Sequence, residues 1–177
     1  ERFHHMLRVF KVTSPMSVGS WILAFSGTSS GVAAGAHVLG MRRLRNAAEA
    51  VSAAFGLPLA TYTAVLVSDT SIPVWHEARH ELPLVFASSS AASAGAAAAL
   101  VVSPEAAAPA RRVAVAGALV ENLAVEVMEK RLGTLGEPYE EGSAGQLNRL
   151  AKALSLSGAA FLQLAGRMSG LREPRSV

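Results

Sequence analysis

The stretch VTSPMSVGSWILAFSGTSSGVAAGAHVLGM, residues 12–41, runs for thirty positions without a Lys, Arg, Asp or Glu. At about 1.5 Å per residue a helix of this length reaches roughly 45 Å, whereas about 20 apolar residues cross the hydrocarbon core of a bilayer. A buried helix of a soluble protein can be this apolar but is rarely this long. The stretch therefore predicts a membrane-spanning helix.

Three glycines in this stretch predict how the helix packs. Gly27, Gly31 and Gly35 are spaced four residues apart and form a double GxxxG. A stripe of this kind lets a neighbouring backbone approach closely, and small residues are typical of helix contacts in lipid. We expect this face to lie against another helix.

Four further stretches repeat the apolar pattern. Residues 82–104, for example, contain no formally charged side chain. The alternative is a soluble Ala-rich bundle, but the stretches lack the polar stripe every 3.6 residues that is typical of its surface helices. The predicted fold class is all-α, a polytopic transmembrane helical bundle that forms a single integral-membrane domain over residues 1–177. About five spans are expected, at approximately residues 14–40, 46–68, 82–103, 111–129 and 147–167.

Composition excludes several cofactors and partners. The net charge of +3 comes from basic residues scattered at the ends of the spans, with no aromatic-interleaved basic face, so nucleic acid is not an expected partner. The chain has no Cys, so iron–sulfur clusters are expected only on a partner. Only His37 lies within a span, whereas a membrane haem needs pairs of axial His, so no haem is expected.

Antiparallel threading of the five spans sorts the connecting segments onto two faces. The first face holds residues 1–13, 69–81 and 129–150, and the second face holds residues 41–46, 104–112 and 167–177. Lys and Arg divide about evenly between the two faces. Two very short loops of the second face are rich in Arg, which favours a cytoplasmic location for that face.

Most groups suited to chemistry gather on the first face. Ser14 precedes the first span, Tyr62 lies about two turns inside the second, and Trp75, His76 and Glu77 follow in the next loop. A hydroxyl, an imidazole and a carboxylate around an apolar shaft can bind a quinone headgroup and give it a proton route. The alternative is an interfacial belt, in which the Trp and Tyr lie at the membrane–water interface because their rings are amphipathic. The quinone hypothesis takes these five residues as cofactor-binding, with no catalytic residue and no metal.

Glu121 lies in the middle of the fourth span beside Asn122. A carboxylate at that depth is costly unless it is protonated, paired or near water, so it is a functional candidate. The two residues are predicted to form a step in a proton path; the alternative is a neutral Glu hydrogen-bonded to a neighbouring helix. Glu126, nearer the end of the span, is expected to be solvated or paired with Lys130.

The segment His76-Glu77-Ala78-Arg79-His80 matches the H-E-x-x-H pattern of zinc proteases. In those enzymes two His ligands lie one turn apart on a helix and a Glu acts as the base. Here Pro73 and Pro83 enclose the motif and leave little room for a stable helix before it. An intramembrane zinc metalloprotease is therefore a remote alternative.

Several segments resemble the NrfD/polysulfide reductase membrane-subunit family. The longest one opens a transmembrane helix in that family, and Val12 departs from the Pro that the family pattern has there. The segments are Arg2-Phe3, Met6-Leu7-Arg8-Val9-Phe10-Lys11, Thr13-Ser14-Pro15-Met16-Ser17-Val18-Gly19-Ser20-Trp21, Leu59-Ala60-Thr61-Tyr62-Thr63, Pro73-Val74-Trp75-His76-Glu77-Ala78-Arg79, Arg131-Leu132-Gly133 and Glu137-Pro138-Tyr139.

The resemblance implies a multi-pass subunit of about eight helices in the bacterial plasma (inner) membrane. Such a subunit exchanges electrons between a quinone, menaquinone or ubiquinone, and an iron–sulfur partner that serves a catalytic subunit, molybdopterin-containing or similar. Tyr62 resembles the tyrosine of the family's quinone pocket, and Glu121 resembles an acidic residue of a later helix. The chain is expected to be a fragment that lacks the first helices and the C-terminal end.

Two functional interpretations stay open at this point. The chain is expected to be a quinone-reactive subunit of an oxidoreductase complex, and this subunit is not active alone. It supplies the quinone pocket, whereas the quinone and the partner's clusters carry the electrons. The alternative is a non-redox membrane anchor or a proton-conducting module.

Overall fold

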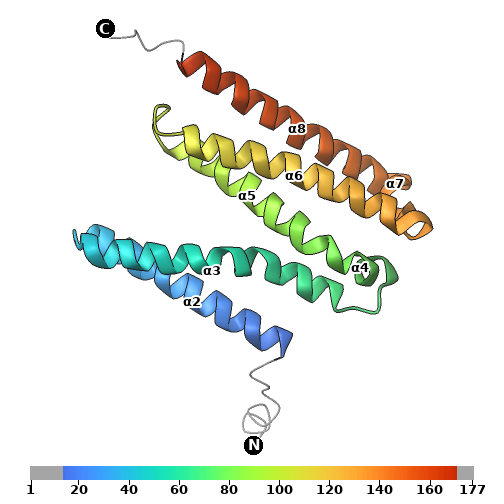
Figure 1. The fold of residues 1–177 in the computed structure, drawn as a ribbon, viewed down its shortest axis with the longest axis horizontal. Coiled ribbons are helices and arrows are strands. Elements are labelled where there is room, and N and C mark those ends of the chain that lie inside the picture. The colour runs from blue at the N-terminus through green and yellow to red at the C-terminus, as the bar shows by residue number, and fades with distance from the viewer. Residues whose placement is uncertain (1–13, 171–177) are drawn as a thin grey trace, which may run out of the picture. The chain divides into compact units, whose positions relative to one another are not determined.

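The computed structural model describes residues 14–170, and these residues are helical with no strand among them (Figure 1). They pack as two compact units, with unit 1 ending at Asp69 and unit 2 beginning at Thr70, and each unit is described by itself. Unit 1 contains α2 (Pro15–Val38) and α3 (Arg42–Ser68). Unit 2 contains α4 (Pro73–Glu77), η1 (Ala78–His80), α5 (Leu82–Val101), α6 (Ala108–Leu132), η2 (Gly133–Gly136), α7 (Glu137–Glu140) and α8 (Gly142–Gly170).

The all-α prediction is confirmed, and each expected span coincides with a long helix, namely α2, α3, α5, α6 or α8. A bundle of five spans is not confirmed. Among the described residues, only α3 and α5 are long and apolar enough to cross a membrane. The reason is compositional: α2 dilutes its apolar residues with Gly, Ser and Thr, whereas α6 and α8 carry charged side chains.

Unit 1 is an antiparallel hairpin of α2 and α3. Gly40, with φ +70°, lies in the turn that joins the two helices. The rings of Phe25 and Phe55 stack with centroids 5.2 Å apart, and the hydroxyls of Ser30 and Ser52 are hydrogen-bonded at 2.7 Å. These pairs fix the register in the middle of the hairpin.

The expected packing of the GxxxG stripe is not found in the described structure. A Cβ built at Gly27, Gly31 or Gly35 meets nothing within 4 Å. The close approach in unit 1 occurs instead at Gly19, where an added Cβ would overlap the ring of Tyr62. The position of a glycine along the hairpin, rather than its spacing from other glycines, therefore decides whether it contacts the neighbouring helix.

Unit 2 is built on a close crossing of α5 and α6. A Cβ at Gly95 would lie 2.5 Å from the backbone nitrogen of Ala114, and one at Gly117 would lie 2.5 Å from that of Ala92. The two glycines therefore bring the helix backbones into direct contact, as small residues do in membrane bundles. Helix α8 packs on α6, where the core cluster is made of Val115, Ala118 and Ala159, with Ala92 and Leu162 against it.

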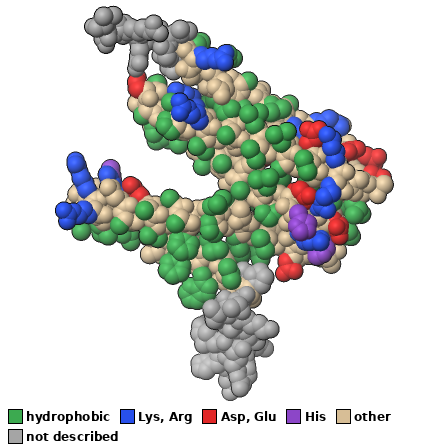
Figure 2. All heavy atoms as spheres, in the orientation of Figure 1, with side chains coloured by type: hydrophobic (Ala, Val, Ile, Leu, Met, Phe, Trp, Pro, Cys, Tyr) green, Lys and Arg blue, Asp and Glu red, His purple; other side chains and the backbone are tan. Residues whose placement is uncertain are grey.

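Burial in the described chain is the reverse of the usual globular pattern. The buried apolar residues are mostly alanines, whereas large apolar side chains such as Leu100 and Phe161 are 86% and 68% exposed. In unit 2 the His and acidic side chains gather at the end that holds α4 and α7, and hydrophobic side chains cover much of the helices (Figure 2). Exposing large apolar side chains to lipid carries no free-energy penalty, so the pattern agrees with a membrane protein.

Candidate functional site

Within each unit the long helices run antiparallel to their neighbours (Figure 1), while the threading of five spans across a membrane stays a prediction. In unit 1 the start of α2 lies beside the last third of α3, because Gly19 contacts Tyr62. In unit 2 the 73–81 segment contacts η2 and the end of α6, while the other end of α6 faces the end of α8. Each end of a unit therefore collects side chains from segments that are distant in the sequence.

Ser14 caps the N-terminus of α2. Its side-chain oxygen accepts a hydrogen bond from the Ser17 backbone N–H at 3.3 Å, and its hydroxyl donates to the Ser17 hydroxyl at 2.9 Å. Serine is a preferred residue at this position because it satisfies an orphan N–H of the first turn. The structure thus gives Ser14 a local structural role at the end of unit 1 where Tyr62 also lies.

Tyr62 projects from α3 onto α2. Its ring occupies the space that a side chain at position 19 would fill, so the glycine is required for the ring to pack there. The side chain is half-buried, and its hydroxyl forms no hydrogen bond with the described residues. A half-buried phenol whose O–H is unused can donate a hydrogen bond to a carbonyl oxygen of a ligand.

The 73–81 segment does not form the continuous helix that an H-E-x-x-H zinc site needs. Helix α4 ends at Glu77, and residues Ala78–His80 continue as the tighter η1. The change from α to 3₁₀ geometry separates the faces of His76 and His80, since only α geometry aligns residues four apart. No group of three or more His, Asp or Glu placed to hold a metal ion is found within residues 14–170.

Arg131 ties this segment to the end of α6. Its guanidinium makes a two-pronged contact with the Glu81 carboxylate, in which Nη2 donates to Oε2 at 2.6 Å and Nε donates to Oε1. Nη2 also donates to the backbone carbonyl of Glu77. The hydrogen bonds from Arg131 hold the pKa of Glu81 below its ordinary value, and the pKa of Arg131 is raised in return. Glu77 therefore contributes its backbone oxygen to this contact, and its carboxylate faces Arg79 at 3.8 Å.

Trp75 contacts Tyr139 of α7. Burial of the ring raises the pKa of Tyr139 and outweighs the lowering effect of the nearby Trp75 side chain. Gly133, with φ +53°, ends α6 and lets the chain turn into η2 and α7, which brings Tyr139 under the segment. The two aromatic side chains thus lie near each other at the end of unit 2.

A second charged group lies beside this contact, between α6 and α8. The Glu129 carboxylate, 13% exposed, accepts from Lys152 Nζ and from the Asn148 amide, both at 2.6 Å. The same amide donates to the Tyr139 carbonyl at 3.2 Å. Glu129 is therefore a well-satisfied carboxylate that fixes α7 and α8 on α6.

The proposed proton-path residues lie on α6. Asn122 donates to the Ala118 carbonyl of its own helix at 2.8 Å and to the Ser155 hydroxyl of α8 at 3.3 Å. Glu121 is half-buried and forms no hydrogen bond or ion pair with the described residues. The expected pairing of Glu126 with Lys130 is confirmed, with 2.7 Å between the carboxylate and the amine.

The predicted site residues are thus divided between the two units. Unit 1 holds Ser14 and Tyr62, and unit 2 holds Trp75, His76 and Glu77. Sequence reasoning did not select the residues that form the charged and aromatic contacts at this end of unit 2, although two of them stand in segments that carried the family resemblance. Residues 1–13, where the first of those segments begins, lie outside the described residues. The residues that form these contacts are Glu81, Glu129, Arg131, Tyr139, Asn148 and Lys152.

A family model described as polysulfide reductase, of the NrfD type, matches residues 1–171 of the 177. No curated protein matches the chain. No solved structure matches it either.

Proposed function

Because the chain belongs to the polysulfide reductase (NrfD) family of membrane subunits, we propose that it is the quinone-interacting subunit of a multi-subunit oxidoreductase. In this role it exchanges electrons between the membrane quinone pool, menaquinone or ubiquinone, and an iron–sulfur partner subunit. That partner in turn serves a catalytic subunit, molybdopterin-containing or similar. The membrane is the bacterial plasma (inner) membrane.

The observation that carries the proposal is the phenol of Tyr62. Quinone and quinol interconvert by two electrons and two protons, and the quinone supplies that redox chemistry when bound. The chain has to supply a hydrogen-bond donor at a carbonyl oxygen, beside an apolar path for the tail. The Tyr62 hydroxyl, unused by the described residues and next to side-chain-free Gly19, fits the first requirement. The exposed apolar rings Trp21 and Phe25 on α2 fit the second.

Protons have to reach the quinone along a route that the chain provides. Glu121 and Asn122 on α6 support such a route, since a half-buried carboxylate without a partner among the described residues can take up and release a proton. Trp75, His76 and Glu77 belong to the proposal as groups at the end of unit 2, where the segment is held in place by Arg131.

The test measures bound quinone. The full-length protein is purified in lipid with its co-purifying partners, and the extracted quinone is identified and counted by mass spectrometry. We expect near-stoichiometric quinone in the wild type and a loss of about tenfold in Tyr62→Phe, since a donor to a buried ligand oxygen is removed. Quinol-linked turnover should fall in parallel.

The matched control is Thr61→Val. It also removes a hydroxyl from α3, but one that is already bonded to its own helix, at 3.1 Å from the Leu57 carbonyl. This variant should keep its quinone. An intact complex with iron–sulfur clusters but no quinone in the wild type would contradict the proposal and favour the non-redox anchor or proton-conducting module.

A further inference from the structure

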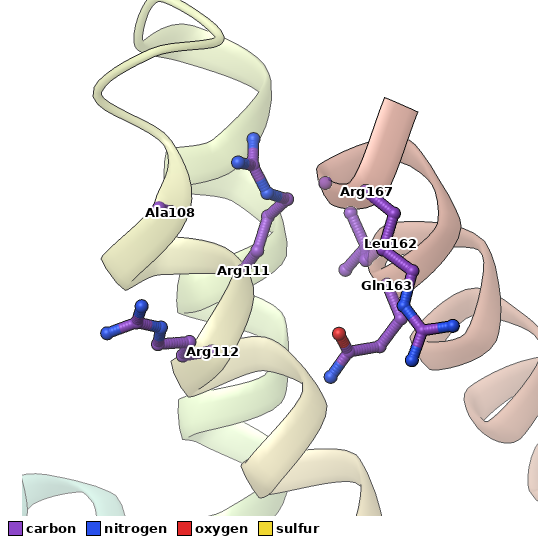
Figure 3. Close-up of a pocket in the computed structure, with 7 residues that line it drawn as sticks. Ala108, Arg111, Arg112, Leu162, Gln163 and Arg167 are labelled. Carbon is purple, nitrogen blue, oxygen red and sulfur yellow. The ribbon is translucent and has the colours of Figure 1, made fainter. Parts of the chain in front are cut away.

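A pocket of about 200 Å³ opens between the first turns of α6 and the last turns of α8 (Figure 3). It lies at the end of unit 2 opposite to the 73–81 segment, so it is separate from the residues discussed above. Its lining consists of Ala108, Arg111, Arg112, Leu162, Gln163, Gly166 and Arg167.

Three of the seven lining residues are arginines, and their charge is not balanced locally. Among residues 14–170 no carboxylate forms an ion pair with Arg111, Arg112 or Arg167. Among the described residues the acidic residue nearest in sequence to Arg111 is Glu105, whose pKa is lowered by its own backbone N–H and by Ser103. Within residues 14–170, therefore, no ion pair compensates the positive charge of the arginines that line the pocket.

The arginine that faces the pocket is held in place. Arg111 donates from Nη1 to the Pro104 carbonyl at 3.2 Å, and its Nε would be 3.1 Å from a Cβ at Gly166, so the missing side chain makes room for it. The side chains of Arg111 and Gln163 extend into the gap between α6 and α8, whereas Arg112 points to the far side of α6 (Figure 3). Helix α6 adds the partial positive charge of its N-terminus at Ala108.

Apolar side chains surround this charged pocket. Leu162 forms part of its wall, and the same turns of α8 expose Phe161, Leu164 and Met168. At the same end of the unit, Val101 is the last residue of α5, a helix long and apolar enough to cross a membrane. The Val101 residue is 87% exposed. The arginines therefore lie where a membrane helix ends, which is the depth of lipid headgroups.

From this arrangement we infer that the pocket binds the phosphate of an anionic phospholipid, with its acyl chains on the exposed apolar surface of α8. A planar guanidinium offers paired donors to phosphate oxygens, and the Gln163 amide adds a neutral donor. A free phosphate ion would use the same donors, but it has no use for the apolar rim. Basic pockets between membrane helices are typical sites for lipid headgroups. This inference does not rest on quinone binding.

The experiment titrates the purified full-length protein with short-chain phosphatidylglycerol and follows binding by native mass spectrometry. Arg111→Gln should weaken binding about fivefold, and Arg111→Gln with Arg167→Gln about twentyfold, since each basic group near a membrane surface contributes to headgroup affinity. The matched control is Arg43→Gln, an exposed arginine of α3 outside the pocket, which should bind as the wild type does. Equal losses in Arg43→Gln and Arg111→Gln would overturn the inference, because binding would then follow net charge.

Two further measurements keep the test decisive. Gly166→Leu keeps every charge but fills the space beside the Arg111 guanidinium, so it should lose lipid as Arg111→Gln does while circular dichroism shows unchanged helix content. Retention of full lipid affinity in this variant would contradict the pocket. Titration with inorganic phosphate separates the two sources of the anion: it should not displace the lipid at equal concentration, and displacement would show a site for the free ion instead.

Discussion

Arg131 favours the ionised form of the Glu81 carboxylate, because its guanidinium donates to both carboxylate oxygens. The folded chain holds the pKa of Glu81 below the ordinary value of 4.5. A carboxylate with a lowered pKa stabilises the fold fully above its unfolded pKa, and this stabilisation is lost as the pH falls through the lower folded value.

The prediction is a pH-dependent difference between the wild type and Glu81→Gln. The variant should unfold more easily than the wild type at about pH 7, and the difference should shrink as the pH falls below about 4.5. Thermal unfolding monitored by intrinsic fluorescence at a series of pH values measures it. Glu141→Gln, at an exposed position, serves as the control and should show no such trend.

Gly19 is the residue on which the position of Tyr62 depends. A side chain there would occupy the space of the phenol ring, so Gly19→Val should displace the ring or destabilise unit 1 by about 1–3 kcal/mol, the usual cost of overpacking. Thermal unfolding together with quinone content checks this expectation. Gly27→Val is the matched control on the same helix, because nothing lies within 4 Å of its added Cβ, and an equal loss in both variants would refute the assignment.

Single residues show what a sequence can and cannot predict about this site. Tyr62 could be placed on the first face from its span and direction alone, and the structure brings it to the same end of unit 1 as Ser14. The GxxxG spacing of Gly27 predicted a contact that the described chain does not make. Spacing says which residues share a helix face, but only the register of the partner helix decides which part of that face is covered.

At the scale of the helix, the crossing of α5 and α6 depends on Gly95 and Gly117, each of which faces the backbone of the other helix. Gly117→Leu should force the helices apart and destabilise unit 2 by about 3 kcal/mol or more, since the added atoms meet rigid backbone rather than a flexible side chain. Thermal unfolding in lipid measures the loss. Gly158→Leu on α8 meets nothing within 4 Å and should stay within about 1 kcal/mol of the wild type.

Helix centres could be predicted from the sequence better than helix ends. The expected span 14–40 coincides with α2, Pro15–Val38, because an uncharged run bounded by a Ser-Pro start leaves little choice. Helix α8 extends beyond the expected span 147–167 and begins at Gly142. Polar residues before position 150 suggested a loop, but Asn148 and Lys152 are helical because they bond to Glu129 of α6, a pairing that no local pattern reveals.

At the scale of the whole molecule, the open question is how many helices cross the membrane. Small residues are buried and large apolar residues exposed throughout the described chain, which favours lipid around both units. Composition alone supports α3 and α5 as spans, whereas α6 carries arginines in its first turns and glutamates farther along. Those charges lie near the two ends of the helix apart from Glu121, so α6 can still cross if its middle is shielded by α5 and α8.

Topology mapping with single cysteines decides this question, because the chain has no native Cys to remove. Five antiparallel spans predict that Cys at positions 41 and 105 reacts with a membrane-impermeant maleimide from one side only, and that Cys at positions 70 and 141 reacts only from the other. Each of these positions lies in a turn or loop, so the substitutions leave the helices intact. Labelling of positions 105 and 141 from the same side would mean that α6 does not cross, and the lipid-headgroup pocket would then lie on the same side as Arg131.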